Sequence, residues 1–236
     1  KSWFNPGFLK LAKITWDTKA AVLEKIMKYE RVHEIKDMDE LKRRLGEDRR
    51  FFSYFHPALE DEPIIFVQVA LTNGLGRSIQ EITKPRLDGD QKYDSATFYS
   101  ISNCQEGLSR VTLGNFLIKR VVFEIQEELP NIKHFGTLSP IPGFRDWFSY
   151  LEDVKIKNIL GDVPIENISF LKSSDLKVGD PRIVSNKVAI KKLVAHYLMN
   201  EKNHKQLPIN DVCRFHLGNG AIIDDIIINA NVSEVG

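Results

Sequence analysis

The stretch that decides the expected fold runs from Ala96-Thr97-Phe98-Tyr99-Ser100-Ile101, through residues 115–129, to His134-Phe135-Gly136-Thr137-Leu138. The first and last pieces are short apolar runs of the kind that form strands. In the middle piece apolar residues recur at helical spacing, at Phe116, Leu117, Val121, Ile125 and Leu129, and Pro130-Asn131 ends the pattern. A strand, a helix and a strand in this order predict a right-handed crossover that joins two parallel strands.

Further elements are expected on both sides of the crossover. Asp17-Thr18 should cap a helix over residues 17–27, Asp37 should begin a second helix that stops at Gly46, and residues 64–71 should form a buried strand before a turn at Asn73-Gly74. Helices near 185–201 and 210–215 should precede a final strand over 221–228. The fold class is therefore α/β with α+β character: a central mixed sheet with flanking helices.

The composition limits which binding partners and which cellular compartment can be expected. With 236 residues of which 42% are hydrophobic, the chain can bury a core as one domain, or as one domain with an appendage. Its net charge of +1 lacks the basic excess of a nucleic-acid binder. Cys104 and Cys213 have no spacing typical of a zinc site or a disulfide scaffold, which favours a reducing compartment. No apolar run approaches the ~18 residues of a membrane span and no signal peptide is visible, so no membrane partner is expected.

A basic run, Lys42-Arg43-Arg44 with Arg49-Arg50, is interleaved with acidic residues. It is compatible either with a solvated helix face or with a contact to phosphate, and such runs are weak signals.

A loop that opens the central helix is a candidate anion site. Residues 106–114 lie between the expected strand and the expected helix, where unpaired backbone N–H groups and the positive end of the helix dipole suit a pyrophosphate. A glycine-containing loop at this place is also compatible with a plain turn.

Two further residues are candidates for chemistry. Ser139 follows the second parallel strand, at the end of the sheet where α/β proteins place ligands, and prolines at positions 140 and 142 stiffen its segment. The alternative is a hydroxyl that caps a helix starting near Gly143. His216 is expected between a helix and the final strand, where a lone histidine is compatible with a purely structural role.

Five motifs occur in an order that resembles the malonyl-coenzyme A decarboxylase family. They are His56-Pro57-Ala58-Leu59 leading into Glu62-Pro63-Ile64-Ile65-Phe66-Val67; residues 97–108; Gly114-Asn115-Phe116-Leu117-Ile118-Lys119; residues 137–144; and Phe215-His216-Leu217 with Asn219-Gly220-Ala221. The resemblance covers nearly the whole chain, although residues 154–180 carry little of it. It implies one catalytic domain over residues 1–236, truncated at its C-terminus and lacking the helical domain that usually precedes it in relatives.

The resemblance also implies the fold and the site. The family is similar to the GNAT-like acyltransferases, whose two parallel strands splay apart beside the helix to admit the pantetheine arm of coenzyme A. The implied catalytic pair is Ser139 and His216, with the serine as acceptor and the histidine as donor. The implied substrate-binding residues are Ser109, Arg110, Val111, Thr112, Leu113, Gly114 and Asn115. The chain departs from many relatives at Arg110, where glycine is common, and at Thr112, where relatives carry glutamate or serine, so the resemblance does not support a catalytic acid at position 112.

The implied reaction is decarboxylation of malonyl-CoA to acetyl-CoA and carbon dioxide through a thioester enolate, as part of malonyl-CoA catabolism in fatty acid metabolism. It needs no metal and no organic cofactor, because the thioester is itself the electron sink. The resemblance implies a homo-oligomer for the full-length protein, a site tyrosine from beyond Gly236, and an intracellular location in cytoplasm, mitochondrion or peroxisome. Two alternatives remain: an acyl-CoA-dependent acyltransferase of the same fold, and a non-catalytic acyl-CoA sensor.

Overall fold

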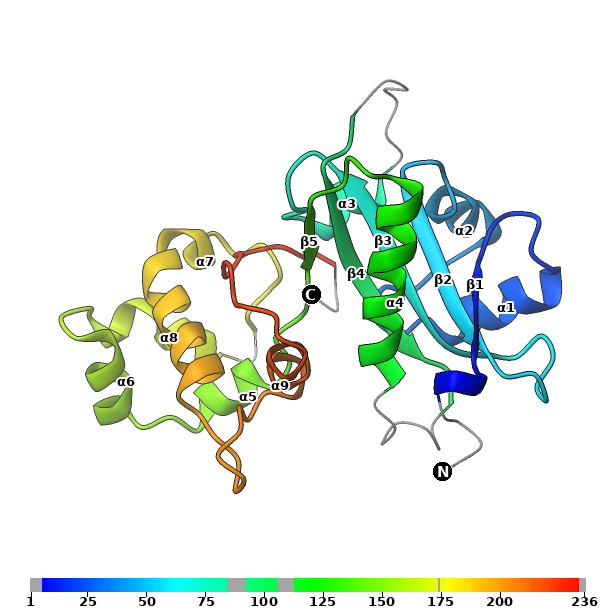
Figure 1. Ribbon diagram of the computed structural model, residues 1–236. Helices are drawn as coiled ribbons and strands as arrows, with labels where there is room; N and C mark the ends of the chain where they lie inside the picture. The colour runs from blue at the N-terminus through cyan, green and yellow to red at the C-terminus, as the bar shows by residue number, and fades with distance from the viewer. Residues whose placement is uncertain (1–5, 85–91, 106–112, 174, 234–236) are drawn as a thin grey trace. The chain divides into compact units, whose positions relative to one another are not determined.

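The computed structural model describes residues 6–84, 92–105, 113–173 and 175–233. The chain packs into two compact units, Lys1–Leu138 and Ser139–Gly236 (Figure 1). The first unit contains the sheet, and the described elements of the second are helices. That both units form one catalytic domain stays a prediction.

The first unit is built on a mixed sheet of five strands in sequential order. The strands are β1 Lys10–Lys13, β2 Arg49–Phe55, β3 Pro63–Thr72, β4 Ser95–Asn103 and β5 His134–Thr137. Neighbours are antiparallel except β4 and β5, which are parallel and joined by α4, Leu113–Glu128. The predicted strand, helix and parallel strand are thus confirmed.

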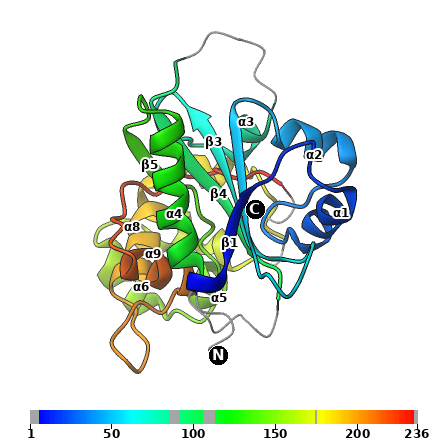
Figure 2. The same ribbon diagram turned by 45° about the vertical axis from the view of Figure 1, so that its right-hand side comes forward.

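Helices cover both faces of this sheet (Figure 2). On one face α4 buries its apolar stripe, including Leu117 and Val121, against Phe52 and Val67. On the other face lie α1 Ala20–Tyr29, α2 Met38–Arg44 and α3 Ile79–Thr83. Because successive side chains of a strand point to opposite faces, β3 is buried along its whole length.

The starts of α1 and α2 test the capping predictions. Asp37 accepts a hydrogen bond from the backbone N–H of Glu40 at 2.7 Å and caps α2 as expected. The cap predicted for α1 is wrong: the N-cap residue is Lys19, without a side-chain cap bond. The Thr18 hydroxyl instead accepts from the backbone N–H of Thr15 at 3.0 Å, which stabilises the preceding turn.

The basic run is not a solvated helix face throughout, because two of its arginines are buried. Arg44 is 4% exposed and donates to the carbonyls of His33 and Glu34. Arg49 is 4% exposed, pairs with Asp48 at 2.6 Å and donates to the Lys84 carbonyl at 3.0 Å. Two of the five cations are therefore buried, and their guanidinium groups donate hydrogen bonds to backbone oxygens of neighbouring segments.

A buried carboxylate ties α1 to the sheet. Glu30, 5% exposed, accepts five hydrogen bonds: from the backbone N–H groups of Val32 and His33, from the side-chain amide of Gln68, and from the hydroxyls of Ser100 and Ser102. The β3–β4 register skips Tyr99. This extra residue lets Phe98 and Ser100 face opposite sides of β4, so both serines can reach Glu30 while Phe98 packs in the α4 core.

The second unit is a helical cluster. Its elements are α5 Phe144–Ser149, α6 Asp153–Leu160, the short 3₁₀ helices Ile165–Asn167 and Ser169–Lys172, α7 Pro181–Ser185, α8 Lys187–Met199 and α9 Asp211–Gly218. The helix predicted over 185–201 is α8, separated from α7 by Asn186. The helices enclose one core that includes Phe148, Leu193 and Tyr197.

The final strand predicted over 221–228 is wrong. A strand needs a neighbour for its backbone hydrogen bonds, and the described part of the second unit offers only an isolated bridge between Lys202 and Pro208. Ile226 and Ile228 instead pack against the helical core, while Ile222 is 84% exposed. Among the described residues, no helix is long and apolar enough to cross a membrane.

Candidate active site

Ser139 and His216 form a hydrogen-bonded pair in the second unit. The Ser139 Oγ lies 3.0 Å from the His216 Nε2, although 77 positions separate the two residues in the chain. Ser139 comes two residues after β5, the place predicted for it. The capping alternative is wrong, because Gly143, and not Ser139, is the N-cap residue of α5.

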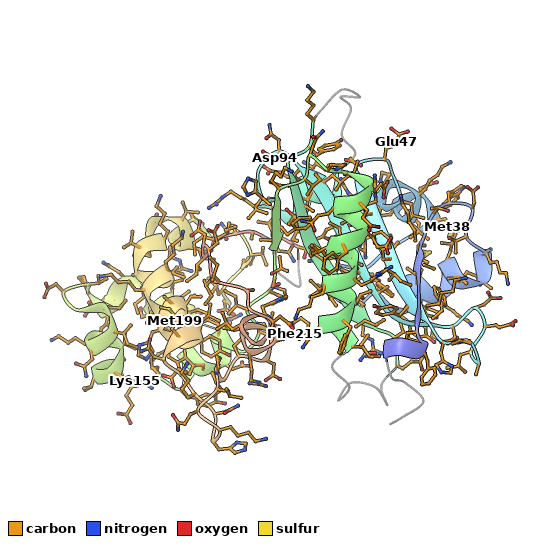
Figure 3. The ribbon with its side chains drawn as sticks, viewed as in Figure 1. Met38, Glu47, Asp94, Lys155, Met199 and Phe215 are labelled. Carbon is orange, nitrogen blue, oxygen red and sulfur yellow. The ribbon has the colours of Figure 1, made fainter. Side chains whose placement is uncertain are left out.

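His216 lies in the last turn of α9, and not between a helix and a strand. Asn210 begins this helix: its side-chain oxygen accepts a hydrogen bond from the backbone N–H of Cys213 at 2.7 Å. Phe215, labelled in Figure 3, precedes the histidine, and the two ring centroids lie 5.0 Å apart. An α-helix begun by Asn210 thus presents His216 to Ser139.

Burial lowers the pKa of His216 below its ordinary 6.5. The charged imidazolium loses hydration in a half-buried site, so the neutral ring is favoured near pH 7. A neutral Nε2 can accept the Ser139 proton, and a protonated Nε2 can donate to the Ser139 oxygen. The pair can therefore move a proton in either direction.

The segment after Ser139 is anchored through one carbonyl oxygen. The Pro142 oxygen accepts hydrogen bonds from the Tyr197 hydroxyl at 3.0 Å and from the Asn210 side-chain amide at 2.8 Å. Gly143 follows with φ of +76°, a conformation that favours glycine. Sequence reasoning missed Tyr197 and Asn210 as site residues; the only available signal was an asparagine at the start of a predicted helix.

The predicted coenzyme A segment is only partly described. Ser109, Arg110, Val111 and Thr112 lie outside the described residues. Leu113, Gly114 and Asn115 form the first turn of α4, where Leu113 is 1% exposed and packs in the core of the sheet unit. A contact from Leu113 or Gly114 to an anion would therefore come from the backbone N–H groups. This role stays a prediction.

The two parallel strands pair over a short length. Their ladder runs from Ser95 with His134 to Phe98 with Thr137, and the Leu138 N–H adds one bond to the Phe98 oxygen at 2.9 Å. Strand β4 continues to Asn103, and beyond Phe98 the described residues form no further ladder on this edge. The parallel ladder thus ends near Phe98 and Leu138, and the splaying of the two strands stays a prediction.

A depression in the first unit is lined by residues other than Ser139 and His216. It has a volume of about 250 Å³, and its lining residues are Leu11, Lys13, Phe52, Glu124, Glu127 and Glu128. Glu128 in this depression is already paired with Lys13 and Arg50, so we assign no ligand to the depression. Within the described ranges, no group of three or more histidine, cysteine or carboxylate side chains is arranged to hold a metal ion.

Comparison with known proteins places this geometry in context. Residues 7–236 match the family model described as malonyl-CoA decarboxylase C-terminal domain. A curated protein named "Malonyl-CoA decarboxylase, mitochondrial" from Anser anser anser is 39% identical over 241 residues, which cover 93% of this chain and 48% of that protein. The crystal structure of malonyl-CoA decarboxylase from Rhodopseudomonas palustris matches with a TM-score of 0.81 and 42% identity, over 98% of this chain and 54% of that one.

A more distant match concerns the fold alone. The loading GNATL domain of CurA from Lyngbya majuscula has a TM-score of 0.55 at 10% identity, over 93% of this chain and 87% of that domain. The GNAT-like fold class is therefore confirmed. The chain spans about half the length of the curated relatives that it matches.

Proposed function

Because this chain belongs to the malonyl-CoA decarboxylase C-terminal domain family, we propose that the protein containing it converts malonyl-CoA to acetyl-CoA and carbon dioxide. The observation that carries the proposal is the Ser139–His216 hydrogen bond of 3.0 Å. It joins the two residues that the family resemblance implies as the catalytic pair.

The proposed reaction breaks one carbon–carbon bond. The bond between the carboxylate carbon and the α-carbon of the malonyl group breaks, carbon dioxide leaves, and the electron pair becomes a thioester enolate. One proton added to the α-carbon then gives acetyl-CoA. The enzyme must polarise the thioester carbonyl, remove water from the carboxylate and supply that proton.

Ser139 and His216 can meet these needs. The serine hydroxyl, at the start of the anchored segment, would hydrogen-bond the malonyl group, and the imidazole would deliver the proton. In the free protein burial lowers the pKa of His216, which disfavours the charged donor. A bound malonyl carboxylate is an anion, so it would raise that pKa again. Substrate binding would thereby help to charge the proton donor that the reaction uses.

Coenzyme A would be bound by the first unit. The backbone N–H groups at the start of α4, together with the preceding segment from Ser109 to Thr112, would hold the pyrophosphate, with Arg110 adding an ionic contact. The pantetheine arm would lie along the edge of β4 after Phe98, where the parallel ladder with β5 ends. An extended, amide-containing arm could bond backbone groups there as a strand does.

We further propose that the reaction needs no metal or organic cofactor, since the thioester accepts the electron pair. The full-length protein would be a homo-oligomer in a reducing intracellular compartment. Both cysteines are free and buried, and burial raises the pKa of each thiol, so both stay protonated and poorly reactive.

The deciding experiment measures products from malonyl-CoA alone with the purified full-length protein. The proposal predicts equal amounts of carbon dioxide and acetyl-CoA. An acyltransferase would release neither in such amounts without an acceptor, and would yield an acylated amine or carrier when one is added. A sensor would bind malonyl-CoA and leave it unchanged. Either of these two results would refute the decarboxylase.

A further inference from the structure

One side chain connects the segment that begins with Ser139 to α9, the helix that carries His216. Asn210 is 3% exposed and uses both ends of its amide. Its oxygen accepts from the Cys213 N–H at 2.7 Å and so begins α9. Its nitrogen donates to the Pro142 oxygen at 2.8 Å, three residues after the serine.

This arrangement needs an amide and not merely a helix cap. Serine, aspartate and asparagine cap helices about equally well, because each offers an oxygen. Only an amide of this length offers an acceptor and a donor on one rigid planar group. With both ends engaged, the amide fixes the start of α9 relative to the Pro142 carbonyl, which lies on the proline-stiffened segment after Ser139.

A second donor makes the anchor rigid. The Tyr197 hydroxyl of α8 bonds the same Pro142 oxygen at 3.0 Å. Its ring packs against Trp147 and Phe144 of α5, with centroids 5.2 and 5.9 Å away. The Pro142 oxygen is therefore held from α8 and from the N-terminus of α9, and the Asn210 bond is the one that ties it to the helix of His216.

We infer that Asn210 is a positioning residue that sets the separation of the Ser139 and His216 side chains. Its kinetic consequence rests on the proposed decarboxylation. A hydrogen-bonded pair transfers a proton efficiently only within hydrogen-bond reach, and a displacement of about 1 Å can cost ~10²-fold in rate. The inference itself concerns geometry, which can be measured without any reaction.

The kinetic test uses Asn210→Asp in the full-length protein. Aspartate keeps the size of the side chain and the capping oxygen but places an acceptor against the Pro142 oxygen. We expect kcat for carbon dioxide release to fall about 10²-fold with KM little changed, since the segment proposed to bind coenzyme A does not include Asn210. Asn186→Asp is the matched control: its amide also donates to a backbone carbonyl, that of Arg182 at 2.9 Å, and kcat should be unchanged.

A double variant separates positioning from general stability. In a His216→Ala background the pair no longer exists, so Asn210→Asp should lower the remaining kcat very little. Losses that multiply in the double variant would overturn the inference, as would a normal kcat in the folded single variant. If Asn210→Asp fails to fold, Asn210→Ser, which keeps a capping oxygen on a shorter side chain, carries the same expectations.

A crystal structure of the full-length Asn210→Asp or Asn210→Ser protein gives a readout independent of activity. The inference expects the Ser139 Oγ and His216 Nε2 to separate beyond ~3.5 Å, past hydrogen-bond distance. An unchanged pair at 3.0 Å would overturn it. Absence of carbon dioxide release by the unaltered protein would refute the proposed function, while the structure would still decide the role of Asn210.

Discussion

Replacing Gly143 by alanine should destabilise the second unit through two separate effects. Gly143 has φ of +76°, where an alanine is strained by roughly 1–2 kcal/mol. A Cβ at this position would also lie 2.8 Å from the Tyr197 hydroxyl oxygen, which is closer than van der Waals contact allows. Because the Tyr197 ring is buried against Trp147 and Phe144, the hydroxyl can yield only by losing its bond to Pro142.

The expected loss follows from these two effects. A hydrogen bond of this kind contributes about 1 kcal/mol, so Gly143→Ala should lower the free energy of opening of the second unit by about 2–3 kcal/mol. Gly179→Ala is the matched control, because Gly179 has φ of +77° and nothing lies within 4 Å of its added Cβ. Only the backbone effect of roughly 1–2 kcal/mol should appear there.

Native-state hydrogen exchange of peptides from α8, measured by mass spectrometry on the full-length protein, reports this local free energy. In a Tyr197→Phe background the nearest ring atom is Cζ, 4.0 Å from the added Cβ, an ordinary contact. Gly143→Ala should then cost no more than Gly179→Ala. Equal losses for the two glycine variants in the unaltered background would refute the argument from Tyr197.

Three further expectations follow from the site. Ser139→Ala and His216→Ala should each lower kcat by at least ~10²-fold, and near-normal turnover by either folded variant would remove that residue from the mechanism. Burial lowers the pKa of His33 and of His216 below 6.5, so the unfolded chain binds more protons than the folded chain as the pH drops. The free energy of unfolding should therefore fall between pH 6.5 and the folded pKa values. The urea midpoint should change less over this pH range in His33→Gln or His216→Gln than in the unaltered protein. Treatment with EDTA followed by dialysis should leave carbon dioxide release unchanged, and activity that returns only with a divalent ion would contradict the cofactor-free mechanism.

The central part of the fold was predictable because its signals are local. The helical spacing of Leu117, Val121 and Ile125 and the short apolar runs beside it required only neighbouring residues. Strand β2 was missed, although its aromatic run from Phe51 to Phe55 was a usable strand signal. Arg49 and Arg50 at its start are typical of an exposed segment, whereas Arg49 is buried and contacts Asp48 and the Lys84 carbonyl.

The candidate pair Ser139 and His216 was predictable, and the side chains that support the pair were not. Ser139 and His216 were assigned through family motifs, because no local pattern connects residues 77 positions apart. The expected strand over 221–228 failed since an apolar run does not reveal whether a partner strand exists. The amide of Asn210 was invisible for a similar reason: a helix cap can be recognised from sequence, but its second bond depends on tertiary packing.

The buried Glu30 carboxylate disfavours incorrect alignments of β3 with β4. Strand β3 is an almost uniformly apolar run, so hydrophobicity alone would tolerate more than one alignment with β4. A slip of one residue would turn Ser100 and Ser102 to the opposite face and leave Glu30 without two of its five donors. An undersatisfied buried charge costs several kcal/mol. The carboxylate therefore penalises misaligned pairing of β3 with β4.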